Sequence, residues 1–138
     1  MIIIDTNVLS EMMRPSPSTK VLKWLNEQNT SFLYITSITL GEIEYGLQIL
    51  PDGNRRQALQ TRFDEFVTKA FKSRTLKHSP EAARIYGSIM AHQRSLGRPM
   101  SIADGQIAAI TKVNNFNLAT RNTKDFKDCG IDLINPFD

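Results

Sequence analysis

The 138-residue sequence has one cysteine, Cys129, and only two histidines, His78 and His92. A single thiol excludes an internal disulfide and a zinc site built from several cysteines. Any bound metal ion must therefore be held mainly by oxygen atoms, which favours Mg²⁺ or Mn²⁺ over zinc. Both histidines lie far in sequence from the acidic motifs described below, so we interpret them as structural or surface residues rather than as a general base.

Long apolar stretches are also missing. No run of about 18 apolar residues occurs, so a membrane span is not expected. The N-terminus carries no basic and apolar leader of the secretory type, and we therefore expect a cytoplasmic protein. The 17 lysines and arginines exceed the 14 acidic residues and give a net charge of +3, which permits a nucleic-acid partner without requiring one.

Length and hydrophobic pattern predict one α/β domain that spans residues 1–138. The expected strands are residues 2–4, 32–35, 75–76, 116–120 and 131–134. The expected helices are residues 8–13, a segment after Ser18, and residues 37–50, 55–71, 80–96 and 101–113. Because strands alternate with helices, we expect a three-layer α/β/α domain with a mostly parallel central sheet of four to five strands.

Small polar residues mark the expected helix ends. Thr6 and Asn7 are expected to cap the first helix, Ser18 the second and Ser79 a later one. Gly97 follows the last periodic residue of that later helix and suits its C-cap. These positions fix the boundaries of the elements that carry the candidate site.

Four acidic residues follow strands of the expected sheet. Asp5 comes directly after three isoleucines, Glu42 lies in the first turns of the helix after the second strand, Asp104 in the first turn of a later helix, and Asp125 shortly after the 116–120 strand. In an α/β sheet, ligands bind outside the carboxyl ends of the strands. Converging carboxylates repel one another, and a divalent cation offsets that repulsion. The spacing therefore predicts an oxygen-ligated Mg²⁺ or Mn²⁺ site formed by these four acids.

Each acid also has a structural explanation when it is taken alone. Ser101 and Asp104 fit a capping box with Asp in the usual Glu position, and Glu42 suits a helix N-terminus. Asp125 suits a turn. Asp5 is harder to explain in this way, because a carboxylate beside buried isoleucines is costly unless it is paired or bound to a cation.

Several short motifs resemble a known family. They are Asp5-Thr6-Asn7 after an apolar strand, the segments 37–42, 102–109 and 118–122, and the ending Asn135-Pro136-Phe137. In order and spacing these motifs resemble the PIN-domain ribonucleases, more closely the VapC toxins of bacterial toxin–antitoxin pairs, and within them the FitB-like group. The resemblance covers nearly the whole chain.

The resemblance implies a Mg²⁺- or Mn²⁺-dependent endoribonuclease in which a metal-activated water attacks the RNA backbone, with tRNA a frequent target. Asp5, Glu42 and Asp104 fall on the three central acids of the family. The fourth acid falls either on Asn122, where many PIN domains have Asp, or on Asp125, which we favour. The resemblance also assigns supporting positions near the metal to Thr6, Asn7, Ser101, Thr120 and Asn122.

The same resemblance implies partners. It predicts a homodimer, inhibited by a small VapB- or FitA-like antitoxin through which the complex contacts DNA. Arg121 and Lys124 flank the fourth acidic position and are the expected RNA phosphate contacts. A second basic group lies on or next to the 55–71 helix and comprises Arg55, Arg56, Arg62, Lys69 and Lys72. We interpret this group as a solvated face, with RNA contact as the alternative.

Two other functions fit parts of the pattern. A nuclease-silent dimeric core of a DNA-bound regulatory complex is the alternative that Asn122 leaves open. A phosphatase or phospho-acceptor domain that uses Asp5 is disfavoured, because haloacid-dehalogenase-type phosphatases have a second Asp where this chain has Asn7.

Overall fold

The computed structural model describes residues 1–138 and contains one five-stranded sheet. Its strands are β1 (Ile2–Ile4), β2 (Leu33–Thr36), β3 (Thr75–Leu76), β4 (Asn117–Ala119) and β5 (Leu133–Ile134). Their order is β3-β2-β1-β4-β5, and every neighbouring pair is parallel. The expected parallel sheet is therefore confirmed, with β1 at its centre.

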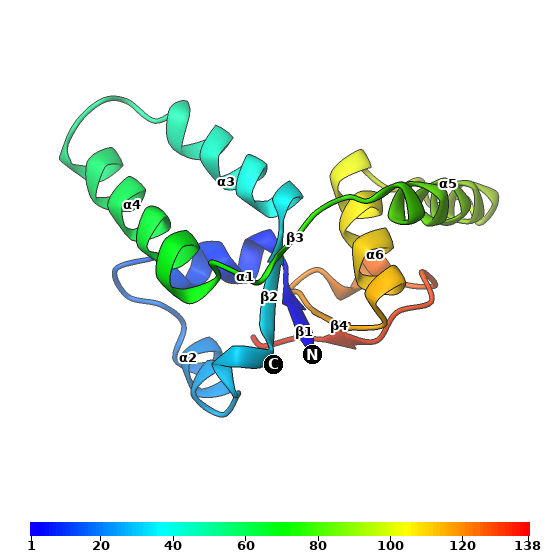
Figure 1. The fold of residues 1–138 in the computed structure, drawn as a ribbon, viewed down its shortest axis with the longest axis horizontal. Coiled ribbons are helices and arrows are strands. Elements are labelled where there is room, and N and C mark those ends of the chain that lie inside the picture. The colour runs from blue at the N-terminus through cyan, green and yellow to red at the C-terminus, as the bar shows by residue number, and fades with distance from the viewer.

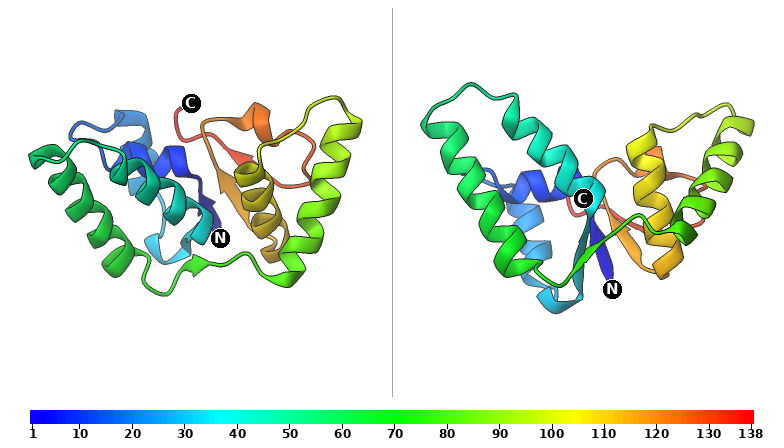
Figure 2. Two further views of the ribbon diagram at one scale, coloured as in Figure 1. Left: turned by 90° about the horizontal axis from the view of Figure 1, so that it is seen from above. Right: turned by 45° about the horizontal axis from the view of Figure 1, so that its top comes forward.

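Helices cover both faces of the sheet (Figure 1). The first group comprises α1 (Thr6–Met12), α2 (Thr19–Asn26), α3 (Ser37–Gln48) and α4 (Asn54–Glu65). The second group comprises α5 (Pro80–Ser95) and α6 (Ile102–Asn114). Figure 2 shows α3–α4 and α5–α6 diverging from the strands as the two arms of a V. This arrangement confirms the three-layer α/β/α fold.

Strand β1 links the two hydrophobic clusters of the core. Its side chains alternate between the sheet faces, so Ile4 packs in the cluster with α1 to α4, and Ile3 packs in the cluster with α5 and α6. Both isoleucines are fully buried. A run of β-branched residues without polar alternation is thus explained by a strand that is covered on both sides.

Several boundaries differ from the expected ones. The 55–71 helix ends at Glu65 and continues as the π-helix η2 (Phe66–Ala70). Strand 32–35 begins one residue later, because Asn29 caps the 3₁₀ helix η1 (Thr30–Phe32) and accepts a hydrogen bond from the Ser31 amide. Asp125 lies in a 3₁₀ helix, η3 (Thr123–Phe126), rather than in a simple turn.

The expected cap of α1 was wrong, whereas Ser18, Ser79 and Gly97 stand at the expected helix ends. Asp5, not Thr6 or Asn7, is the N-cap of α1, because its carboxylate reaches the Thr6 amide. Ser18 makes no side-chain cap, and its amide instead donates to Glu11. Ser79 caps α5 through the Ala82 amide. Gly97 adopts φ +73°, the left-handed conformation that suits a residue after a helix. None of the helices combines the length and apolarity needed to cross a bilayer.

Candidate active site

Asp5 lies at the carboxyl edge of the sheet, where three hydrogen bonds hold its carboxylate. It directly follows β1, and only 4% of its surface is exposed. Its Oδ1 accepts from the Thr6 amide at 2.8 Å, and its Oδ2 accepts from the Thr120 hydroxyl at 2.8 Å. The Asn7 amide group donates to the same Oδ2 at 3.3 Å. Asp5 is therefore held in one orientation by residues from two adjacent strand ends.

Burial raises the pKa of Asp5 from its usual value to about 6. The hydrogen bonds from Thr120 and Thr6 act in the opposite direction, because they favour the ionised carboxylate. The negative charges of Asp104 and Glu42 add to the rise. Three of the four predicted acids thus influence one another electrostatically across large distances in sequence.

Glu42 lies on α3 and is exposed. The Thr6 hydroxyl donates to its Oε1 at 2.7 Å, so the residue after Asp5 orients the second acid. Thr6 also shares a 3.0 Å hydrogen bond with Thr39, which is fully buried. Thr39 was not among the residues predicted from the sequence. It lies three residues after Thr36, whose hydroxyl accepts from the Thr39 amide, and this N-cap spacing is the sequence feature that could have identified it.

Asp104 serves two purposes at the start of α6. The Ser101 hydroxyl accepts from the Asp104 amide at 3.1 Å, so the capping interpretation of Ser101 is confirmed. The side chain of Asp104 is half-buried, and burial raises its pKa. The Ser101 hydroxyl partly opposes this rise, while the charges of Asp125 and Glu42 add to it. Helix capping and membership of the acidic group are therefore compatible.

The fourth position concerns Asn122 and Asp125. Asp125 is exposed on η3, and its negative charge raises the pKa of Asp104, whereas the acids that raise the pKa of Asp5 are Asp104 and Glu42. It shares a pocket of about 420 Å³ with Asp104. Asn122 is exposed, and its amide donates to the Thr120 hydroxyl at 3.1 Å. Asp125 is thus the acid next to Asp104, whereas Asn122 is connected to Asp5 through Thr120.

The acids do not form a compact cage. No three His, Cys, Asp or Glu side chains lie close enough together to hold one metal ion. Mg²⁺ keeps several of its waters and is usually held directly by only one or two carboxylates. A group of oxygen ligands in which burial and neighbouring acids raise the pKa values of Asp5 and Asp104 suits such a partly hydrated cation. The donor set is therefore compatible with Mg²⁺ or Mn²⁺.

The predicted phosphate contacts have different surroundings. The Arg121 guanidinium lies 4.6 Å from the centre of the Phe137 ring, and the Arg121 amide donates to Asn7 at 3.1 Å. Lys124 is exposed and lines the pocket that contains Asp104 and Asp125. Lys124 therefore lies beside two of the acids, while Arg121 packs on the C-terminal segment.

A second hollow, here called the α1–α4 groove, begins at Thr6 and Glu42 and has a volume of about 710 Å³. It runs between α1, α3 and α4, and its lining combines apolar side chains with three arginines: Met13, Leu47, Leu50, Leu59, Arg14, Arg55 and Arg62. Arg62 also donates to the Met13 carbonyl at 2.6 Å. Arg55 and Arg62 of the basic face predicted for the long helix are exposed, as expected for a solvated face, and they also line this groove.

The fold and the site together define a three-layer α/β protein with an acidic site at the carboxyl edge of a parallel sheet. Residues 2–131 match the model of the PIN domain family, and the chain belongs to that family.

Known proteins similar to this chain agree with that assignment. A VapC ribonuclease of Sinorhizobium fredii is 38% identical over 138 residues, which cover 100% of this chain and 99% of the relative. The toxin FitB of Neisseria gonorrhoeae is 33% identical over 99% of both chains. The solved structure of FitAB bound to an IR36 DNA fragment has a TM-score of 0.93 at 33% identity and covers 100% of this chain and 96% of the other.

Proposed function

We propose that this protein is a Mg²⁺- or Mn²⁺-dependent endoribonuclease and the toxin of a type II toxin–antitoxin pair. The observation that carries the proposal is the electrostatic coupling of Asp5, Glu42 and Asp104 at one edge of the sheet, with the pKa of Asp5 raised to about 6. Relatives named VapC ribonuclease and toxin FitB support the nuclease class. A cytoplasmic location and tRNA as the target class are part of this proposal.

The chain's own residues have distinct roles in this proposal. Asp5, Glu42, Asp104 and Asp125 would hold the cation, one or two of them directly and the others through its waters, because no three of them lie close enough to bind one ion. A cation bound there would supply Lewis acidity and a nucleophile at neutral pH. Thr120 and Asn7 fix the orientation of Asp5, and Thr6 fixes that of Glu42.

In this proposal the basic residues at the same edge of the sheet bind the RNA phosphates. Lys124 lies beside Asp104 and Asp125, so its ammonium group can neutralise a phosphate next to the scissile one. The amide of Arg121 is fixed by Asn7, and its guanidinium lies on an aromatic ring. We assign the stronger contribution to Lys124, because its surroundings are shared with the acids.

We further propose that the α1–α4 groove receives an antitoxin segment of the VapB or FitA type, and that the toxin forms a homodimer which contacts DNA only through that antitoxin. Apolar side chains of the partner would pack on Leu47, Leu50 and Leu59, and acidic ones would pair with the arginines. The FitAB structure with DNA supports this assembly. Co-expression with the protein of the neighbouring reading frame, followed by size-exclusion chromatography, tests it, and separate elution of the two proteins would contradict it.

RNA cleavage by purified protein tests the nuclease directly. Wild type should cleave RNA in Mg²⁺ or Mn²⁺ and should stop cleaving in EDTA, whereas Asp5→Asn should be inactive under both conditions. Asp132→Asn, at an exposed position with no side-chain hydrogen bond, is the matched control and should cleave like wild type. Equal cleavage by wild type and Asp5→Asn would contradict this mechanism, and inactivity of both would favour the nuclease-silent regulatory core.

A further inference from the structure

The pocket beside Asp104 and Asp125 extends away from the acids toward the end of α5. Its further lining consists of Gln93, Arg98, Pro99 and Met100. None of these residues belongs to the acidic site, yet the pocket connects them to it. Its volume of about 420 Å³ lies in the range of small-molecule sites and exceeds what a single phosphate needs.

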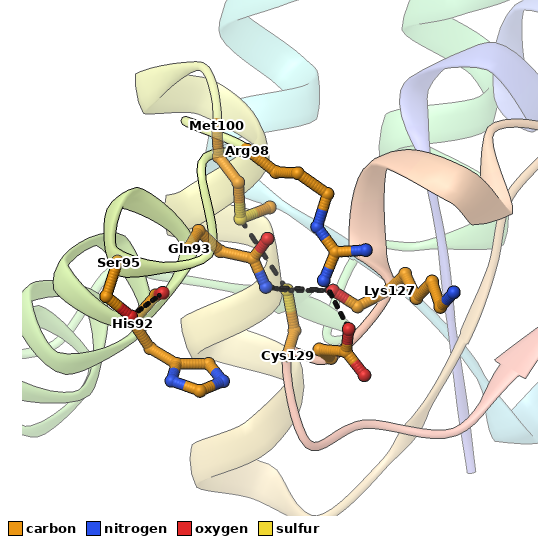
Figure 3. A network of polar contacts seen from close by, with 8 residues as sticks. His92, Gln93, Ser95, Arg98, Met100, Lys127 and Cys129 are labelled. Atoms are coloured by element: carbon orange, nitrogen blue, oxygen red, sulfur yellow. Dashed lines mark hydrogen bonds and ion pairs between the residues drawn. The ribbon is translucent and has the colours of Figure 1, made fainter.

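Gln93 is the unusual member of this lining. It is only 2% exposed, although it is a polar residue on a surface helix. Its Nε2 donates to the Lys127 carbonyl at 2.8 Å and contacts the Cys129 sulfur at 3.5 Å. Figure 3 shows this network and places the carboxamide oxygen on the side away from Lys127. That oxygen, Oε1, accepts no hydrogen bond from the protein.

The orientation of the Gln93 carboxamide is fixed by chemistry. The Lys127 carbonyl can only accept, so the amide nitrogen must face it and Oε1 must face the other way. His78 Nε2 is the only fully enclosed side-chain polar atom without a partner. Oε1 therefore keeps access to open space, and Gln93 lines the pocket. A nearly buried acceptor without a partner favours a ligand, because a ligand N–H group can form the hydrogen bond that water, with its limited access, forms less readily.

The surrounding residues indicate which donor fits. Pro99 and Met100 offer apolar surface, and Met sulfur packs well against aromatic rings. Arg98 is paired with Asp128, so its charge is partly neutralised and does not by itself call for an anion. At the other end the pocket reaches Lys124 and the two acids. A flat heterocycle with an N–H group, attached to a phosphodiester, matches both ends.

We propose that this pocket binds the base of the nucleotide next to the scissile phosphate, and that Gln93 Oε1 accepts from its exocyclic amino group. Adenine, cytosine and guanine carry such a group. Uracil has no exocyclic amino group. Gln93 is thus a specificity-determining residue for the nuclease. This inference rests on the proposed function for its substrate class, but its test uses binding rather than cleavage.

The experiment measures fluorescence anisotropy of labelled five-nucleotide RNAs with the full-length protein in EDTA, which prevents cleavage. Two RNAs differ only at the central base, adenine in one and purine, the same ring without the amino group, in the other. Wild type should bind the adenine RNA about fivefold more tightly, as expected for one hydrogen bond. Gln93→Met should bind both RNAs equally. Cys129→Ala removes the sulfur contacts with Gln93, Met100 and the Lys127 carbonyl but leaves the hydrogen bond from Gln93 to Lys127, and it should keep the difference.

Equal binding of the two RNAs by wild type would overturn the base subsite, even if Gln93→Met fails to fold, because the change is made in the RNA. A Gln93→Met protein that keeps the fivefold difference would overturn the role of Gln93, as would absence of any RNA binding by wild type. If wild type cleaves RNA with Mg²⁺ yet does not distinguish adenine from purine, the subsite is wrong and the nuclease stands. If it distinguishes them but never cleaves, the nuclease is wrong and the subsite stands.

Discussion

The Thr120 hydroxyl donates a 2.8 Å hydrogen bond to Oδ2 of Asp5, although 115 positions separate the two residues in sequence. The bond exists because β1 and β4 are adjacent parallel strands, so that Ile4 and Ala119 are paired and the residues that follow them meet at one edge. It ties the central acid to the segment that carries Arg121, Asn122 and Asp125. The register of two short strands thus positions most of the candidate site.

The raised pKa of Asp5 predicts that Asp5→Asn stabilises the metal-free protein at neutral pH. The folded protein holds the Asp5 proton up to about pH 6, while the unfolded chain releases it near 3.8. The folded state therefore binds more protons between these values, and stability falls as the pH rises through this window. Above this window the folded protein carries the full cost of an ionised, buried carboxylate. Asn never ionises and therefore avoids this cost.

Urea unfolding in EDTA measures this effect. Asp5→Asn should exceed wild type in free energy of unfolding by about 3 kcal/mol at pH 7.5, and the difference should disappear near pH 3.5. Asp132→Asn should match wild type throughout, since its side chain is exposed. A destabilised Asp5→Asn at neutral pH would show that the carboxylate is satisfied in the folded protein without a cation.

Thr6 is predicted to position Glu42 rather than to support the fold. Thr6→Val removes the 2.7 Å hydrogen bond to Glu42 and the 3.0 Å hydrogen bond to Thr39 with little change in volume, and it should slow RNA cleavage by about tenfold and weaken Mn²⁺ binding similarly. Thr6→Ser keeps the hydroxyl and should restore both. Thermal unfolding of the two variants serves as the control. Normal cleavage by Thr6→Val would separate Thr6 from the site.

Gly105 is predicted to be needed for the contact between α5 and α6. A Cβ at this position would lie 2.5 Å from Met90 Sδ and 2.9 Å from a Tyr86 ring carbon. Gly105→Ala should therefore lower the free energy of unfolding by about 1–3 kcal/mol, and it should reduce cleavage because Asp104 precedes it. The matched change Gly87→Ala, on α5 with open space around it, should raise stability by about 1 kcal/mol. Equal effects of the two substitutions in urea unfolding would contradict this packing argument.

Much of the fold follows from local sequence signals. The isoleucines of β1, the Ser79 and Ser101 caps and Gly97 each encode their structure within a few residues, and parallel pairing then brings the acids to one edge. The cap of α1 was misassigned because Asp, Thr and Asn are all good caps and three of them stand in succession. Local preference alone does not show which of the three residues is the N-cap at the end of β1.

Other features depend on contacts that no local pattern encodes. Arg121 packs on Phe137 only because the C-terminal segment returns to the end of β4. Gln93 is indistinguishable in sequence from a solvated helix residue, and its burial follows from the position of the Lys127 carbonyl. The sequence predicted one metal site formed by the four acids and left the number of ions open. In the structure no three of them lie close enough together to hold an ion directly, which a list of acidic residues cannot reveal.

Mn²⁺ binding, followed by electron paramagnetic resonance of the free ion, tests the central claim most directly. Wild type should bind Mn²⁺, Asp5→Asn and Asp104→Asn should each bind it at least about tenfold more weakly, and Asp132→Asn should match wild type. Mn²⁺ affinities of Asp5→Asn and Asp104→Asn equal to that of wild type would contradict the assignment of this acidic edge as the metal site.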